Sequence, residues 1–190
     1  MNLWFRLLFT LLWSWRRPPC SLTHGCSTPF RVWPTDLDTA VHVNNGVYLS
    51  LMDIARLDFM IRTGTFATLL RNKWFPVVAA ETIQFHRALL PFERFYIETR
   101  LIGWDERTFY VRQRFSRLRV DGELVADAIV RGIMVRRSGG TIPMPELLKA
   151  IGTPPRPEPM PAWIEDWARA MDANRERLKQ QKAPAEFRDR

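Results

Sequence analysis

The sequence has few of the residues from which metal and redox sites are built. It contains two cysteines, Cys20 and Cys26, and three histidines, His24, His42 and His86. The cysteines lie six positions apart, which fits neither a CxxC redox motif nor a four-ligand zinc site. They also make no disulfide framework, so a reducing compartment is expected. The histidines are too widely spread for a metal site, and we expect neither a metal nor a cofactor.

Several catalytic and nucleotide-binding motifs are also missing. The chain has no GxSxG nucleophile elbow, which argues against a serine hydrolase. It has no phosphate-binding loop and no dinucleotide fingerprint. A net charge of +8 and a pI near 10.3 suit a polyanionic partner, but the basic residues occur singly or in pairs, without a zinc-finger or RNA-recognition motif. We therefore expect a solvated basic surface and no nucleic acid partner.

The apolar stretch at the N-terminus is too short to cross a membrane. Residues 3–15 are strongly apolar, whereas a membrane-spanning helix needs about 20 such residues. Arg6 interrupts the stretch and no small-residue cleavage site follows it, which argues against a secretory signal. We expect a helix here.

Polar residues recur at every fourth position of this segment and form a narrow stripe on a helix, opposite a wide apolar face. They are Asn2, Arg6, Thr10 and Ser14. Two alternatives follow. The helix packs on its own domain, or it lies on a membrane with Arg16 and Arg17 at the lipid headgroups.

The remaining composition is that of a soluble domain. The chain has 190 residues, of which 46% are hydrophobic and 25% charged, enough for one domain with short extensions. We divide it into an apolar amphipathic helix at 1–19, a main domain at 27–142, and a proline-rich linker with a C-terminal helix at 143–190.

Hydrophobic periodicity predicts one long helix and a set of strands. Apolar residues three or four apart indicate a buried helix from Asn45 to Thr63, followed by a short helical piece at 66–72 and a tail helix near 162–181. Alternating patterns indicate strands at 27–34, 76–90, 93–104, 107–118 and 123–137. One strand, a long helix and four strands in meander order predict an α+β hotdog fold, an antiparallel sheet wrapped around one long central helix.

The loop before the long helix carries the most reactive side chains. Asp36, Asp38, His42, Asn44 and Asn45 lie within ten residues, and a helix start offers unpaired amides and a partial positive charge. Such amides polarise a carbonyl oxygen. Asp38 is placed to activate water or attack the carbonyl, and His42 to orient a group or carry a proton. The alternative is a tight loop in which Asp36 and Asp38 only cap turns.

The stretch DLDTAVHVNNGVYL at 36–49, which follows Trp33-Pro34, resembles the hotdog thioesterase families. These include the 4-hydroxybenzoyl-CoA thioesterases and the plant acyl-carrier-protein thioesterases, and the nearest likeness is to the group containing thioesterase superfamily member six. The likeness extends through His86-Arg87 and the run TRLIGWDERTFYVRQRF at 99–115, and covers about residues 27–137.

The resemblance implies roles for individual residues. Asp38 matches the catalytic carboxylate, His42 belongs to the catalytic set of the plant enzymes, and the helix-start amide near Asn45 polarises the thioester. An asparagine of the plant set falls on Ala40 here. Residues in the matched stretches that we expect to bind substrate are Asn44, Tyr48, His86 and Arg87.

We therefore expect a hydrolase of acyl-CoA or acyl-carrier-protein thioesters. By resemblance it forms a homodimer, or a higher homo-oligomer, with sites between subunits. A cytoplasmic protein with a peripheral membrane contact through residues 1–17 is expected. The alternative, favoured by Ala40 and the apolar N-terminus, is a non-catalytic acyl-binding or membrane-associated hotdog module. A hotdog dehydratase is disfavoured because the loop resembles the thioesterase branch.

Overall fold

A computed structural model describes residues 3–152 and 159–182 of the chain, which fall into two units, Met1–Pro157 and Glu158–Arg190. The second unit contains one described helix, α5 (Ala162–Lys182), where a tail helix was predicted. The first unit contains all other elements, which are α1 (Leu3–Ser14), β1 (Cys26–Arg31), the 3-10 turn η1 (Pro34–Asp36), α2 (Asn45–Arg62), α3 (Thr65–Asn72), β2 (Trp74–Phe85), β3 (Arg94–Trp104), β4 (Thr108–Arg117), β5 (Leu124–Arg136), β6 (Thr141–Ile142) and α4 (Met144–Ile151).

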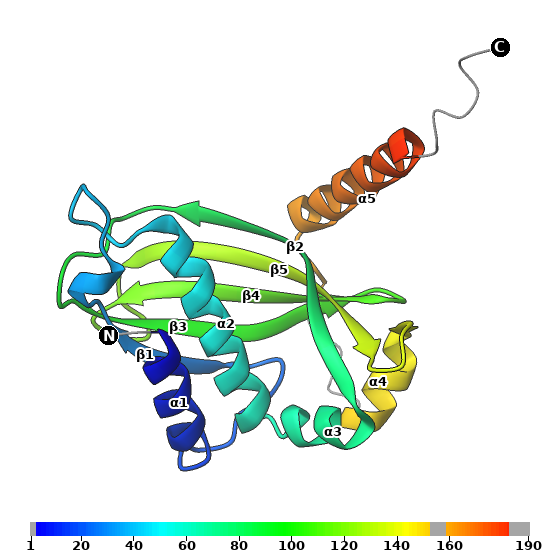
Figure 1. Cartoon of the computed structure of the whole chain (residues 1–190), viewed down its shortest axis with the longest axis horizontal. Helices are drawn as coiled ribbons and strands as arrows, with labels where there is room; N and C mark the ends of the chain where they lie inside the picture. Colours follow the sequence, from blue (N-terminus) through cyan, green and yellow to red (C-terminus); the bar gives the residue numbers. More distant parts are fainter. Residues whose placement is uncertain (1–2, 153–158, 183–190) are drawn as a thin grey trace. The chain divides into compact units, whose positions relative to one another are not determined.

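The strands form one antiparallel sheet with α2 across one face (Figure 1). The strand order is β1-β3-β4-β5-β2, and the short β6 pairs with β5. β3, β4 and β5 are joined as consecutive hairpins, but β2 pairs with β5 and β1 takes the place beside β3, so the predicted meander of four strands is wrong for its first strand. This arrangement confirms the predicted hotdog fold and leaves β1 and β2 as the two edges of the main path.

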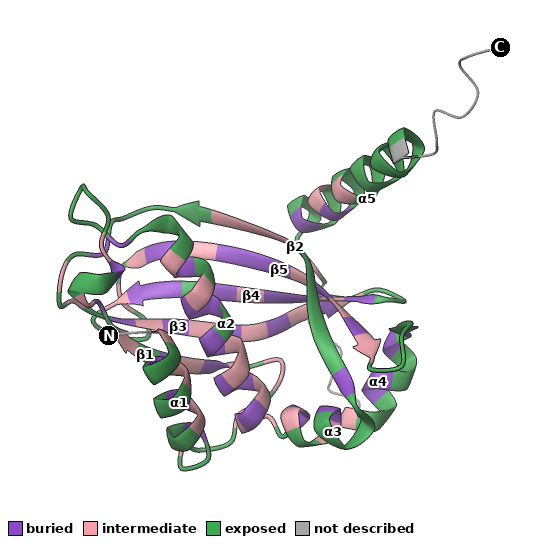
Figure 2. Cartoon of the chain, in the orientation of Figure 1, coloured by how far each residue is buried: buried purple, intermediate pink, exposed green. Residues whose placement is uncertain are grey.

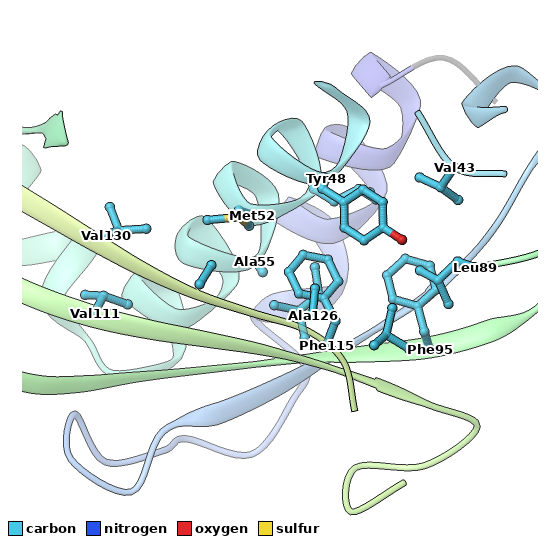
Figure 3. Close-up of a cluster of buried hydrophobic side chains, with 14 of the residues drawn as sticks. Val43, Tyr48, Met52, Ala55, Leu89, Phe95, Val111, Phe115, Ala126 and Val130 are labelled. Atoms are coloured by element: carbon cyan, nitrogen blue, oxygen red, sulfur yellow. The ribbon is translucent and has the colours of Figure 1, made fainter. Parts of the chain in front are cut away.

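The core lies between α2 and the sheet. Alternate residues of β3, among them Phe95 and Ile97, are buried on the face that α2 covers. Figure 3 shows Tyr48 and Met52 of α2 facing Phe115 of β4. Each such buried apolar side chain contributes about 1.5–3 kcal/mol to folding, so α2 is fixed firmly on the sheet. Its N-terminal end, which begins at Asn45, is thereby fixed too.

Helix α1 packs on the same unit, but it buries its polar face, whereas an ordinary surface helix buries its apolar face. Its polar residues Arg6, Thr10 and Ser14 are buried, whereas its aromatic residues and two of its leucines are exposed (Figure 2). The exposed fraction reaches 74% for Trp4, and Phe5, Leu8, Phe9, Leu12, Trp13 and, just after the helix, Trp15 are also exposed. The stripe predicted from the sequence is present, apart from Asn2, which lies outside the described residues. It faces the domain, and the apolar face points outward.

Two buried carboxylates hold α1 in place. Asp36 Oδ2 accepts a hydrogen bond from Arg6 Nη2 at 2.5 Å, and Asp58 Oδ1 of α2 accepts one from Ser14 Oγ at 2.6 Å. Asp58 is 0% exposed. Its other oxygen has three further donors, which are Thr28, Arg17 and Arg62. Since an unpaired buried carboxylate is costly, α1 is an integral part of the hotdog unit.

Two features of the structure were not predicted. Cys20 and Cys26 form a disulfide with a Cα–Cα distance of 5.9 Å, so the expectation of two reduced cysteines is wrong. Helix α4 lies in the stretch expected to be a proline-rich linker. Pro143 directly precedes it, and it buries Met144, Leu147 and Leu148, which share one face at helical spacing.

Candidate active site

The loop before α2 is closed by its own backbone. Leu37 and Val43 form an isolated antiparallel bridge, and the Asn44 amide donates to Asp36 O at 2.8 Å. The Asp36 carboxylate accepts from the Trp33 amide at 2.7 Å as well as from Arg6. Asp36 is therefore a structural residue that fixes the base of the loop.

Asp38 lies at the tip of this closed loop. Its amide donates to His42 O at 2.8 Å, and its Oδ1 accepts from the amides of Ala40 at 2.8 Å and His42 at 3.3 Å. Val41 completes the turn with a φ of 60°. The Asp38 side chain is exposed, and its Oδ2 has no hydrogen-bond donor among residues 3–152 and 159–182. One carboxylate oxygen is thus held by the backbone and the other is available.

The start of α2 presents an unpaired amide beside this carboxylate. Asn44 is the N-cap, and its side-chain Oδ1 accepts from the Gly46 amide at 2.8 Å. The Val47 amide donates to Asn44 O at 2.9 Å. In the described part of the chain the Asn45 amide has no hydrogen-bond acceptor, and it lies where the helix dipole is positive. The geometry suits a developing negative charge on an oxygen.

A pocket of about 320 Å³ brings most of the expected site residues together. Its lining includes Asp38, His42, Asn45, Tyr48, His86 and Arg87, with Val43, Phe85 and Ala88. Asn44 is not among the lining residues because its side chain caps α2. Asp36 is not among them either. Residues from the loop and the first turn of α2 thus face one cavity with residues at and just after the end of β2, more than thirty positions later in the sequence.

Tyr48 forms the inner wall of this pocket. Its ring is buried and packs edge-on against Phe85, with centroids 5.0 Å apart, and at a tilt against Phe115 at 5.2 Å. Burial raises the pKa of the Tyr48 phenol, and a backbone hydrogen bond involving Leu89 and the charge of Arg117 oppose this rise only in part. The phenol therefore stays protonated and can donate a hydrogen bond at neutral pH.

His86 and Arg87 form the opposite rim, where the chain leaves β2. Both amides donate to Val125 O, at 2.8 and 3.1 Å, so the backbone is fixed while both side chains remain exposed. Arg87 pairs with Glu123 at 3.0 Å, with side chains 63% and 48% exposed. This pair is accessible to solvent and weak, so the guanidinium is free to exchange Glu123 for an anionic ligand.

The sequence did not single out Val43, Phe85 or Ala88 as site residues. Phe85 is recognisable as the last residue of an alternating strand directly before His86. Val43 and Ala88 carry no polar group, so only the fold places them in the lining. Groups of three or more metal-ligating side chains are absent from residues 3–152 and 159–182.

Comparison with known proteins assigns the family. Residues 32–168 match the model of the thioesterase-like superfamily, which is most of the chain and includes the closed loop, α2 and the whole sheet except β1. The chain belongs to the thioesterase-like superfamily. The resemblance drawn from the Asp38 loop and the 99–115 run is thereby confirmed.

Named relatives agree with this membership. The chain is 34% identical over 134 residues to Protein THEM6 of Xenopus laevis, a match that covers 70% of this chain and 64% of that protein. The chain therefore spans less than two thirds of the length of this relative. Among solved structures, the YbaW probable thioesterase of Escherichia coli superposes with a TM-score of 0.62 at 22% identity, covering 67% of this chain and 96% of that one. The 4-hydroxybenzoyl CoA thioesterase of Pseudomonas sp. strain CBS-3 gives 0.59 at 18%, covering 67% and 99%. Both structures support the hotdog fold.

Proposed function

We propose that the chain hydrolyses acyl-CoA thioesters in the pocket at the start of α2. The observation that carries this proposal is the meeting of a half-free carboxylate, Asp38, and an unpaired helix-start amide, Asn45, on one cavity. Thioester hydrolysis needs a base or nucleophile on one side of the carbonyl carbon and a hydrogen-bond donor at its oxygen. Family membership supports the same chemistry.

The thioester carbonyl oxygen accepts a hydrogen bond from the Asn45 amide, which stabilises the oxyanion of the tetrahedral intermediate. Asp38 Oδ2 removes a proton from a water molecule as its oxygen attacks the carbonyl carbon. The C–S bond then breaks, the intermediate collapses to the carboxylic acid, and the thiolate of coenzyme A takes up a proton. Direct attack by Asp38 through an anhydride, followed by hydrolysis, gives the same products.

The other pocket residues support this step. Asn44 caps α2 and so holds the Asn45 amide in position. Tyr48, kept protonated by burial, lies beside the reacting carbonyl, and His42 assists proton transfer from its place on the same lining. His86 and Arg87 receive the thiol side of the substrate, where the phosphates of coenzyme A attract a guanidinium.

The discriminating experiment separates hydrolysis from mere binding. A panel of acyl-CoA esters of increasing chain length is incubated with the purified chain, and the released thiol is measured. Affinity for a thioether analogue that cannot be cleaved is measured in parallel by calorimetry. Thiol release that saturates with substrate supports the enzyme. Tight binding of the analogue with no thiol release on any ester identifies a non-catalytic acyl-binding module.

We also infer a homodimer formed through β2. This strand is an edge of the sheet, 12 residues long, and most of it is exposed (Figure 2). Its exposed side chains include Phe75, Val77, Val78 and Phe85. A long apolar edge with free backbone groups is a template for another strand, and two copies pair antiparallel about a two-fold axis. Since β2 ends at the pocket, the partner would lie beside the site.

Light scattering tests the dimer. At micromolar concentration the chain should have twice its 22.3 kDa mass, and Val78→Lys on the free edge should reduce it to one copy. The matched control is Leu70→Lys on α3, an exposed leucine away from this edge. A wild-type chain that stays at one copy contradicts the inference.

We further infer that α1 lies on a membrane surface. Its outward face is aromatic and aliphatic, and a helix of this kind buries such a face at the boundary of headgroups and acyl chains. Arg16 and Arg17 follow at its end, although Arg17 also binds Asp58. Within residues 3–152 and 159–182, no helix has both the length and the apolarity for a membrane span.

A further inference from the structure

A second pocket lies between α1 and the β1 edge of the sheet, distinct from the site of hydrolysis. Its volume is about 620 Å³, and it shares no lining residue with the Asp38 pocket. Three guanidinium-bearing residues line it: Arg6, Arg31 and Arg94. Its remaining walls are largely aromatic, with Phe9, Phe30, Trp33 and Tyr96. We call it the arginine pocket.

Two of these arginines face each other without a counter-ion. Arg31 of β1 and Arg94 of β3 are register partners in adjacent antiparallel strands, where like charges directly opposite each other are destabilising. Both residues are exposed, and neither guanidinium forms a hydrogen bond or ion pair within the described ranges. The neighbouring acid, Glu93, is engaged with Arg117 at 3.4 Å. The two strands therefore concentrate positive charge that no side chain of the described residues neutralises.

The third arginine, Arg6, lines the pocket but is itself buried. Arg6 is 4% exposed. Its Nη2 binds Asp36 Oδ2 and Arg31 O, while its Nη1 is buried with no hydrogen-bond partner among the described residues. A buried guanidinium nitrogen without an acceptor is unfavourable. The exposed guanidiniums of Arg31 and Arg94 at this pocket match a ligand that has several strongly accepting oxygens and a negative charge.

We propose that the arginine pocket binds the phosphate of an anionic phospholipid headgroup. Arginine pairs with phosphate through parallel N–H donors. The lipid source follows from α1, because Arg6 and Thr10 line the pocket on the inner side of the helix, while Leu8 and Leu12 are exposed on its outer side. A lipid whose acyl chains meet the outer side can place its headgroup at the pocket. This proposal rests on the inferred membrane contact of α1.

The test combines vesicles with a soluble phosphate. Co-sedimentation is measured with vesicles of phosphatidylcholine and of an equimolar mixture of phosphatidylcholine and phosphatidic acid. Melting temperature is measured with inorganic phosphate against chloride of equal ionic strength. The proteins are the wild type, Arg31→Gln/Arg94→Gln, and the charge-matched control Arg71→Gln/Arg107→Gln, whose exposed arginines lie elsewhere. Leu8→Glu/Leu12→Glu reports on the α1 contact alone.

Wild type and control should bind the phosphatidic acid vesicles about thirtyfold more tightly than the neutral ones, a factor expected of two arginines near an anionic surface. Arg31→Gln/Arg94→Gln should lose this preference, keep its binding to neutral vesicles, and lose the stabilisation by phosphate. Equal preference in this variant and the control overturns the proposal.

The remaining outcomes separate the possible sources of phosphate. Stabilisation by inorganic phosphate without an anionic vesicle preference identifies a soluble phosphate compound and overturns the lipid assignment. A raised KM for acetyl-CoA in Arg31→Gln/Arg94→Gln, measured without lipid, assigns the pocket to the phosphates of coenzyme A instead. If the wild type binds neither kind of vesicle, both the membrane contact of α1 and the headgroup site are wrong. If Leu8→Glu/Leu12→Glu alone loses binding to phosphatidylcholine vesicles, the membrane contact of α1 is supported.

Discussion

Helices α1 and α2 lie against each other in the same unit, yet they bury opposite kinds of surface. α2 buries Leu51, Met52 and Ala55 against the sheet. α1 buries Arg6, Thr10 and Ser14 and leaves its apolar residues outside. The first arrangement is that of any core helix in water. The second is favourable in water only if the outer face meets another apolar medium.

We therefore expect the two helices to have different roles. In the proposed function, α2 places the Asn45 amide and the Asp38 carboxylate on one pocket. α1 is held by hydrogen bonds to two buried carboxylates, those of Asp36 and Asp58, and presents its apolar residues to the outside. Because Asp36 is also the base of the loop that carries Asp38, the two regions are mechanically joined. Their functions should nevertheless be separable by substitution.

The largest effect is expected from breaking the ion pair between Arg6 of α1 and Asp36 of the loop. Arg6→Met leaves the Asp36 carboxylate buried without its partner and should lower the free energy of unfolding by about 3–5 kcal/mol. Urea denaturation followed by circular dichroism measures this change. The double variant Arg6→Met/Asp36→Asn, which removes the charge as well, should recover a large part of the loss. A single variant as stable as the wild type would show that α1 is only loosely attached.

Substitution on the outer face should affect membrane contact without affecting chemistry. Leu8→Glu/Leu12→Glu removes two apolar side chains, each of which favours burial by about 1.5–3 kcal/mol. Binding to phosphatidylcholine vesicles should weaken by at least about a hundredfold, while turnover of a soluble short-chain acyl-CoA stays unchanged. The matched control is Leu70→Glu/Leu118→Glu, two exposed leucines elsewhere on the unit. Equal vesicle binding by this control and the α1 variant contradicts the assignment.

His42 should matter less than the carboxylate it accompanies. His42→Ala removes a group that assists proton transfer, and turnover should fall by about a hundredfold at most, the lower end of general acid–base contributions. The backbone of residue 42, which supports Asp38 through its amide and carbonyl, remains. The pH profile of kcat/KM is the decisive measurement. A melting temperature lower by several degrees with an unchanged profile indicates a purely structural histidine.

The smallest expected effect is a gain. Ala40→Asn restores the side chain that the plant acyl-carrier-protein thioesterases would have at this position of the resemblance. One additional hydrogen bond of about 0.5–1.5 kcal/mol in the transition state gives at most about a tenfold increase in kcat. Ala40→Gln is the control for added volume. An equal effect of both changes, or a loss in both, excludes a specific role for an asparagine here.

Periodicity predicted the elements that bury an apolar face in the ordinary way. α2 and most of the strands followed from spacing, because that signal is local. The orientation of α1 did not follow, since a stripe pattern shows two faces but not which medium each one meets. The partners of Asp58 could not be predicted either, because Ser14 and Thr28 are distant in sequence and meet it only in the fold.

The sequence could name residues of the candidate site, but it could not predict how they are arranged. Asp38, His42, Asn45, Tyr48, His86 and Arg87 were named from the motif and its resemblance, and all six line one pocket. Asn44 was expected to bind substrate, but its side chain caps α2 instead of lining the pocket. The Cys20–Cys26 disulfide depends on a contact that the local pattern does not encode. Helix α4 does have a local signal, the helical spacing of Met144, Leu147 and Leu148, within the stretch predicted to be a linker.

The most direct test of the account is the rate of thiol release by Asp38→Asn bound to vesicles. The substitution keeps the shape of the side chain and removes the base, so turnover should fall by about a hundredfold to ten-thousandfold. Co-sedimentation and melting temperature should match those of the wild type, because residue 38 is exposed and the asparagine Oδ1 can still accept from the amides of Ala40 and His42. Wild-type turnover in this variant on every ester tested contradicts the claim that Asp38 carries the reaction.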